Sequence, residues 1–147
     1  MRLVKSNDPI LHQPSLPVLW APGVWDRFLG DLWRVMVKND GVGLSAVQVG
    51  RLYQVFVMQD QVTGRPMHVI NPKLKNYTNK TETDMEGCLS YPNRIRAVER
   101  PSKIWVSYTC GLTGLQREER LTGLNARIFL HEYDHLQGIT FMEPSAY

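Results

Sequence analysis

Apolar side chains between Pro22 and Asn39 recur at steps of three and four residues, the spacing of one face of an α-helix. The apolar positions are Val24, Trp25, Phe28, Leu29, Leu32, Trp33, Val35 and Met36. Turn-forming residues 39–41 follow and provide a helix stop. The pattern therefore predicts an N-terminal amphipathic helix over 22–39. Residues 1–22 carry four prolines, which exclude a regular helix there and indicate an extended arm.

The middle of the chain changes to short β-prone stretches separated by turn formers. The stretches cover residues 53–58, 67–70, 95–98, 104–108 and 115–121, and the turn formers include 63–66, Asn71-Pro72 and 112–114. Short strands joined by such turns favour antiparallel or mixed sheets.

A second helix is predicted from Thr122, a candidate N-cap, to a stop near Gln137-Gly138. Leu124 and Ile128 lie seven and three residues before His131, so an apolar, core-facing stripe leads to that histidine. The succession of helix, strands and helix predicts an α+β fold, with antiparallel or mixed sheets around this second helix. A chain of 147 residues fits one domain, 1–147.

Composition excludes several classes of protein. No apolar run approaches the roughly 18 residues of a membrane span, and the N-terminus lacks a signal peptide, so we expect a cytoplasmic protein. The net charge is +3, but the basic residues are scattered and mark no nucleic-acid surface. Cys88 and Cys110 need not form a disulfide in a core of this size, and Cys110 is expected to be a buried, unreactive thiol.

Two histidines, His131 and His135, flank a carboxylate, Glu132, within the second predicted helix. Residues four apart lie on one face of a helix, so both imidazoles can reach one metal ion. Glu132 lies next to the first histidine, where it can take a proton from a metal-bound water. Two histidines at this spacing can also occur by chance on a solvated helix, but here they continue an apolar stripe. The segment predicts half of a hydrolytic metal site.

A catalytic site of this kind needs a third protein ligand. Cys88 is the best candidate, because Gly87 and Pro92 bracket a short loop that can bring its thiolate to the metal. A lone cysteine beside a glycine is more often structural, so its neighbours must decide. The alternative is a zinc endopeptidase with a later ligand, for which Glu143 is available.

Three segments of this chain resemble, in order and spacing, the three signature motifs of the peptide deformylases. They are Gly41-Val-Gly-Leu-Ser-Ala-Val-Gln-Val-Gly50, Glu86-Gly-Cys-Leu-Ser90 and His131-Glu-Tyr-Asp-His-Leu136. The resemblance covers nearly the whole chain. It implies a metal-dependent hydrolase that removes the formyl group from the N-terminal formylmethionine of new peptides and releases formate. The remaining alternative is a deformylase-like module with little or no activity.

The resemblance also implies the roles of individual residues. Cys88, His131 and His135 would bind one divalent metal ion, Fe²⁺ in most of the family, for which Zn²⁺, Ni²⁺ or Co²⁺ can substitute. Glu132 would act as general base and acid. The side chain of Gln48 and the backbone N–H of Leu89 would stabilise the oxyanion. The substrate-binding residues would be Val42, Gly43, Gly87, Leu124 and Ile128, with the two glycines leaving room for an extended peptide and the apolar residues lining a methionine pocket.

The chain departs from the family pattern at Ser45, Val47 and Leu130, where alanine, proline and glutamine are usual. None of the three is an implied ligand, base or oxyanion donor, so they bear on rate and not on reaction type. The sequence printed ends without a further C-terminal helix, so ribosome docking is not expected. We expect a monomer whose partners are formylated nascent peptides. Its setting is expected to be bacterial, viral or organellar.

Overall fold

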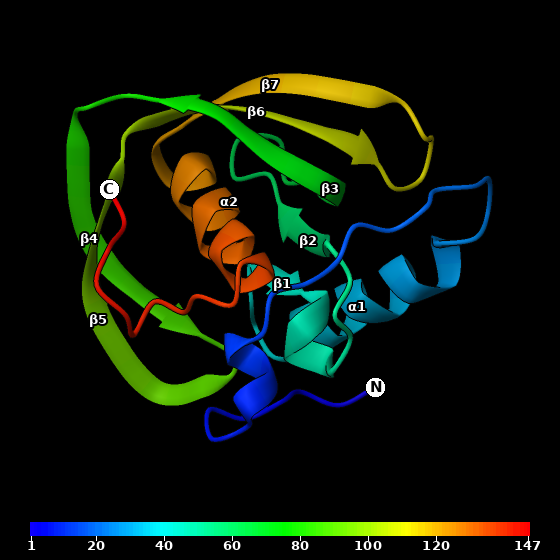
Figure 1. The fold of residues 1–147 in the computed structure, drawn as a ribbon, viewed down its shortest axis with the longest axis horizontal. Coiled ribbons are helices and arrows are strands. Elements are labelled where there is room, and N and C mark those ends of the chain that lie inside the picture. Colours follow the sequence, from blue (N-terminus) through cyan, green and yellow to red (C-terminus); the bar gives the residue numbers. More distant parts are fainter.

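Seven strands form two antiparallel sheets in the computed structural model, which describes residues 1–147 (Figure 1). The larger sheet has the spatial order β1 (Gly43–Ser45), β2 (Val55–Gln59), β3 (Pro66–Tyr77), β6 (Lys103–Cys110) and β7 (Gln116–Thr122). The smaller sheet is the hairpin of β4 (Thr81–Cys88) and β5 (Tyr91–Pro101). The helices are α1 (Asp26–Lys38) and α2 (Gly123–Leu136), with two 3₁₀ segments, η1 (Pro9–His12) and η2 (Ala46–Val49). The α+β prediction is confirmed.

Both predicted helices form. Helix α1 begins at Asp26, four residues later than expected, and ends at Lys38, before the predicted stop. Its side chains Leu29, Leu32 and Met36 are buried among residues of β1 and β2. Helix α2 ends at Leu136 and is followed by Gly138 with φ 77°, as the predicted stop requires. Thr122 occupies the N-cap position of α2, but its side chain makes no capping hydrogen bond.

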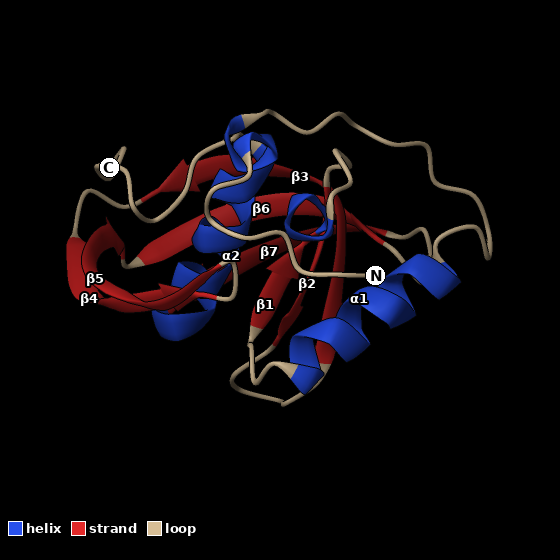
Figure 2. Ribbon diagram, turned by 90° about the horizontal axis from the view of Figure 1, so that it is seen from below, coloured by secondary structure: helices blue, strands red, loops and turns tan.

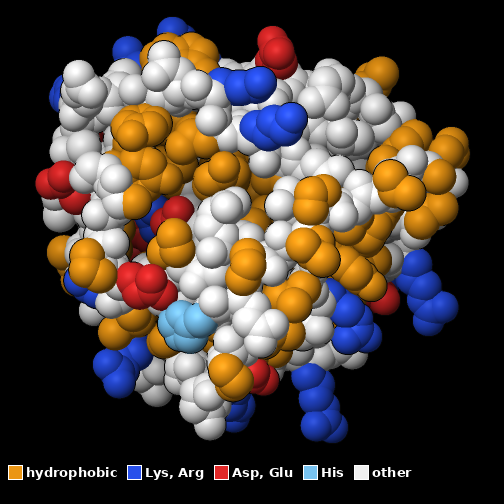
Figure 3. Space-filling model, viewed as in Figure 1, with side chains coloured by type: hydrophobic (Ala, Val, Ile, Leu, Met, Phe, Trp, Pro, Cys, Tyr) orange, Lys and Arg blue, Asp and Glu red, His pale blue; other side chains and the backbone are white.

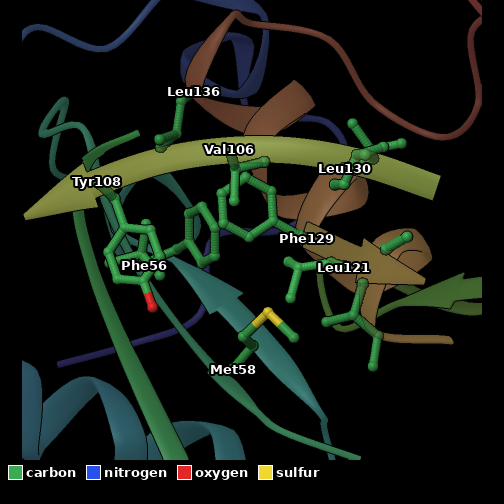
Figure 4. Close-up of a cluster of buried hydrophobic side chains, with 12 residues drawn as sticks. Phe56, Met58, Val106, Tyr108, Leu121, Phe129, Leu130 and Leu136 are labelled. Carbon is green, nitrogen blue, oxygen red and sulfur yellow. The ribbon is translucent and has the colours of Figure 1, made fainter. Parts of the chain in front are cut away.

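Helix α2 lies at the centre of the molecule with strands around it (Figure 1). Figure 4 shows the hydrophobic cluster that joins the helix to the larger sheet, where Phe129 of α2 meets Phe56 of β2 edge to face at 5.0 Å between ring centroids. Ten of the 14 residues of helix α2 are buried. Polar side chains on this helix must therefore find partners inside the protein.

Helix α1 and the β4–β5 hairpin lie at opposite ends of the molecule in both views (Figures 1 and 2). None of the helices is both long enough and apolar enough to cross a membrane. On the face drawn in Figure 3, Lys and Arg side chains are scattered among hydrophobic, acidic and neutral ones. Both cysteines are free, and Cys110 is half-buried, so the expectation of a fully buried thiol there was wrong.

The predicted turn at Asn71-Pro72 was wrong, because these residues lie inside β3. Asn71 has φ 51°, and the register of β3 against β6 shifts between Ile70 and Lys73. The Asn71 side chain exchanges two hydrogen bonds with the backbone of Val18, at 2.9 and 2.7 Å. The turn-forming residue therefore produces a β-bulge that binds the N-terminal arm, and the strand continues past it.

The loop predicted between Gly87 and Pro92 is shorter than expected. Gly87 and Cys88 end β4, Pro92 already belongs to β5, and the turn itself is Leu89 and Ser90. The sulfur of Cys88 is thus presented by the end of a strand that pairs with its neighbour, which holds it more firmly than a loop would.

The N-terminal arm is extended apart from a turn at Ser6–Asn7 and the 3₁₀ turn η1, and it crosses several elements. The N–H of Val4 donates to the carbonyl of Gln48 at 2.7 Å, and the N–H of Ser15 donates to the carbonyl of Leu136, at the end of α2, at 2.9 Å. Leu16 forms a parallel bridge with Tyr53. The arm therefore connects η2, the segment before β2 and the C-terminal end of α2.

Candidate metal centre

Cys88, His131 and His135 form the one cluster of side chains suited to hold a metal ion, with their donor atoms within 4.8 Å of one another. Cys88 Sγ lies 3.4 Å from Nε2 of His135. Metal–sulfur bonds of about 2.3 Å and metal–nitrogen bonds of about 2.0 Å in a tetrahedron separate the donors by similar distances. The residues therefore fit a single divalent ion. The predicted ligands from β4 and α2 meet at one point.

The imidazoles of His131 and His135 differ in their hydrogen-bond partners and in the direction of their pKa shifts. Nδ1 of His131 lies 2.9 Å from Oε1 of Glu86, so Nδ1 is the protonated nitrogen and Nε2 is left to ligate. In the metal-free protein, burial lowers the pKa of His131, but hydrogen bonds to Cys88 and Glu86 outweigh burial and raise it to about 10, so a binding metal ion would have to displace the proton of Nε2. His135 is completely buried, its Nδ1 has no partner, and burial lowers its pKa, so it is a neutral ligand.

Glu86 is the centre of a buried ion-pair network beneath the metal ligands. It accepts hydrogen bonds from Arg100 at 2.6 and 2.9 Å and from Arg127 at 2.6 Å, and Arg100 also pairs with Asp134 at 2.9 Å. Burial alone would raise the pKa of Glu86. The hydrogen bonds from Arg100 and His131 outweigh burial and lower this pKa to about 2. Glu86 is therefore a carboxylate at neutral pH and fixes the ring of His131.

The sequence did not identify Glu86 or Arg100 as parts of the site. Glu86 stands two residues before Cys88 in the same motif, but no strand was predicted there, so alternation along a strand could not place its side chain beside the site. Arg100 lies near the far end of β5 and carries no local signal.

Glu132 is 3% exposed and does not belong to the group that can hold a metal. Its Oε1 accepts a hydrogen bond from the hydroxyl of Ser45 at 2.7 Å. Burial raises the pKa of Glu132, and the charge of His131 and the Ser45 hydrogen bond act against this rise. Gly43 lies directly beside it, since a Cβ at Gly43 would come within 2.6 Å of Oε2 of Glu132. The absence of a side chain at Gly43 therefore leaves room for the carboxylate of Glu132 as well as for a molecule bound in the cavity.

Gln48 is buried on η2, and its amide is held from both ends. Its Oε1 accepts the N–H of Ser45 at 3.0 Å, while Nε2 donates to Oγ of Ser90 at 3.2 Å and to Sγ of Cys88 at 3.4 Å. The oxygen is therefore fixed away from the metal ligands and the N–H groups are directed at them. The backbone N–H of Leu89, in the turn beside Cys88, donates to no group of the protein.

A cavity of about 710 Å³ opens over these residues. Its lining includes every implied binding residue, namely Val42, Gly43, Gly87, Leu124 and Ile128, together with Gln48, Cys88, Leu89, His131 and Glu132. Ile128 is buried, but Leu124 is 52% exposed. The expectation that Leu124 faces the core was therefore wrong, because it lies on the rim of the cavity in the first turn of α2.

Glu143, the further ligand available to a zinc endopeptidase, pairs with Nδ1 of His12 at 3.2 Å and lies outside the metal cluster. The donor set is instead one thiolate and two imidazoles, with Glu132 beside it and a cavity above. This arrangement on a His-Glu-x-x-His helix defines the protein as a metal-dependent hydrolase.

Comparison with known proteins narrows this class. The model of the polypeptide deformylase family matches residues 1–146, and the chain belongs to that family. It is 37% identical to a peptide deformylase of Pseudothermotoga lettingae over 93% of this chain and 78% of the relative. It is 36% identical to peptide deformylase 1B of Arabidopsis thaliana, chloroplastic/mitochondrial, over 97% of this chain and 53% of that protein. The crystal structure of peptide deformylase from Thermotoga maritima matches with a TM-score of 0.92 and 36% identity, over 99% of this chain and 97% of that one.

Proposed function

We propose that this protein hydrolyses the N-terminal formamide of formylmethionyl peptides and releases formate. The observation that carries the proposal is the convergence of Cys88, His131 and His135 beside the buried carboxylate of Glu132. Membership of the polypeptide deformylase family supports the same reaction. We expect a monomer, in a bacterial or organellar setting like those of its relatives.

The metal is expected to be ferrous iron, with zinc, nickel or cobalt as substitutes, because a thiolate and two imidazoles suit such ions. A bound ion supplies Lewis acidity and a water of lowered pKa. Cys88, His131 and His135 hold the ion, and Glu86 holds the ring of His131.

Glu132 moves the proton. Its carboxylate takes one proton from the water whose oxygen forms the new bond to the formyl carbon. The carbon–nitrogen bond then breaks, and Glu132 delivers that proton to the departing amine. The products are formate and a free amino terminus. Burial of Glu132, which raises its pKa, suits it to both halves of this exchange.

The oxyanion that forms on the formyl oxygen needs hydrogen-bond donors. Nε2 of Gln48 lies beside the metal ligands, and the N–H of Leu89 has no other partner in the protein. These two groups are the donors of the proposed reaction.

The methionine side chain occupies the apolar part of the cavity, between Val42, Leu124 and Ile128. An unbranched thioether is held there by burial. Arg127 contributes its aliphatic stem alone, because its guanidinium is bonded to Glu86 and to backbone carbonyls of β4 and β5.

The test is a formate assay. Protein loaded anaerobically with Fe²⁺ or Ni²⁺ should release formate from formyl-Met-Ala-Ser, and it should release no acetate from acetyl-Met-Ala-Ser. Absence of formate release by protein that carries one metal ion per chain would contradict the proposal. Cleavage of an internal peptide bond by the same preparation would favour the endopeptidase alternative.

A further inference from the structure

Ser45, the last residue of β1, is completely buried and contacts the proposed base. Its Oγ lies 2.7 Å from Oε1 of Glu132 and 3.4 Å from Oε1 of Gln48. A hydroxyl has one hydrogen to donate, and a carboxylate only accepts. The shorter distance and the charge therefore assign the Ser45 hydrogen to Glu132.

The two carboxylate oxygens of Glu132 are in different surroundings. Oε1 is held by Ser45, whereas Oε2 accepts no hydrogen bond from the protein and lies against Gly43, which lines the cavity. Ser45 and Gly43 are two residues apart on β1, so both face the same side of the strand. One strand thus fixes one oxygen and leaves space for the other.

We infer that Ser45 is a positioning residue for Glu132, whose hydroxyl orients the carboxylate so that Oε2 is the oxygen that exchanges the proton. The inference rests on the proposed function of Glu132. Without the Ser45 hydroxyl the plane of the carboxylate can turn about its terminal bond, and one of its two equivalent oxygens then points correctly into the cavity for a smaller share of the time.

Ser45 itself is not part of the cavity lining. A bound peptide therefore does not touch it, and its removal should leave substrate binding intact. It is not a metal ligand either. Loss of its hydroxyl should act on the chemical step alone, which appears in kcat and not in KM.

The experiment compares the whole metal-loaded protein with its Ser45→Ala variant, which removes one oxygen atom and adds no bulk. We expect kcat for formyl-Met-Ala-Ser to fall on the order of 10-fold, because loss of an outer partner of a site residue has effects of that size. KM should stay within about twofold of the wild type. The absorption spectrum of the Co²⁺-substituted variant should match the wild type, because the three ligands are undisturbed.

Ser15→Ala is the matched control. Ser15 is also buried, but its Oγ has no hydrogen-bond partner and it lies in the N-terminal arm. It should match the wild type in kcat, KM and Co²⁺ spectrum.

An unchanged kcat in Ser45→Ala would overturn the inference. So would a raised KM or an altered Co²⁺ spectrum, because either would show that Ser45 acts on substrate binding or on the ligands. An inactive wild type would instead contradict the proposed function, and the inference would fall with it. The wild-type measurement in the same assay separates these two failures.

Discussion

Glu132 and Cys88 lie beside the same cavity, but replacing each of them should have a different effect on metal content and activity. Glu132→Ala takes away the proton carrier and leaves all three ligands, so it should keep its metal and lose about 10²- to 10⁴-fold in kcat. Cys88→Ala leaves two imidazoles and should lose metal on dialysis. Metal content per chain and formate release, measured on the same samples, distinguish the two. Activity that survives in Glu132→Ala would show that another base operates.

Glu86 should make the metal-free protein sensitive to acid. Its pKa is about 2 in the folded state against 4.5 unfolded, so its contribution to stability is present above pH 4.5 and is lost as the pH falls toward 2. Glu86→Gln leaves Arg127 without its charged partner and Arg100 with Asp134 alone, so it should lower the free energy of unfolding by about 3–5 kcal/mol near neutral pH.

Urea unfolding at a series of pH values measures the effect. The difference between wild type and Glu86→Gln should shrink steadily from pH 4.5 to pH 2. Glu118→Gln, at an exposed position of β7, should stay close to the wild type throughout. A difference that does not depend on pH would show that the charge of Glu86 is not its source.

Some residues of the site are marked by short motifs in the sequence, whereas others are recognised only by contacts with residues far away along the chain. The cluster of Cys88, His131 and His135 could be predicted because a helical repeat and three short motifs mark it. The Ser45–Glu132 and Glu86–His131 contacts join residues 87 and 45 positions apart. One chain without its fold carries no pattern for such pairs, so Ser45 was visible only as a departure from the family.

At the scale of the elements, the regular pairing of β3 is interrupted by the bulge at Asn71. Asn71→Ala should be destabilising for two reasons, because alanine is strained at φ 51° and the two hydrogen bonds to Val18 are lost. The strain costs about 1–2 kcal/mol, and each neutral hydrogen bond about 1 kcal/mol.

Asn71→Gly separates the two causes, since glycine adopts positive φ freely and lacks the side chain. The free energy of unfolding from urea titrations should fall less in Asn71→Gly than in Asn71→Ala. Equal losses in the two variants would show that the backbone conformation at Asn71 carries no strain.

Helices α1 and α2 and strands β2, β6 and β7 were predicted over most of their length, because they carry apolar or β-prone residues in regular succession. Strands β3 and β5 were predicted only in part, over 67–70 and 95–98. Strand β4 was missed because Glu86 is its single buried residue, so its hydrophobic pattern is absent. Strand β1 has three residues, too few for any period to be read.

At the scale of the whole molecule, the metal ligands come from β4 and α2, so the site exists only in the folded chain. A ligand that binds the folded state alone stabilises it, by about 2.7 kcal/mol at a free concentration 100 times its Kd. Thermal unfolding should therefore shift to higher temperature as Ni²⁺ or Zn²⁺ is added. Cys88→Ala should lose most of this shift, and an equal shift in the variant would show that the ions bind elsewhere.

The N-terminal arm has a consequence for how the chain folds during synthesis. Ser15 hydrogen-bonds to Leu136, and His12 pairs with Glu143, so an early part of the chain is completed by a part that is made much later. Closing so long a loop is entropically costly and slow, and the contact order of these pairs is high. We expect the part of the arm around His12 and Ser15 to dock only after α2 has emerged from the ribosome, as a late step of folding.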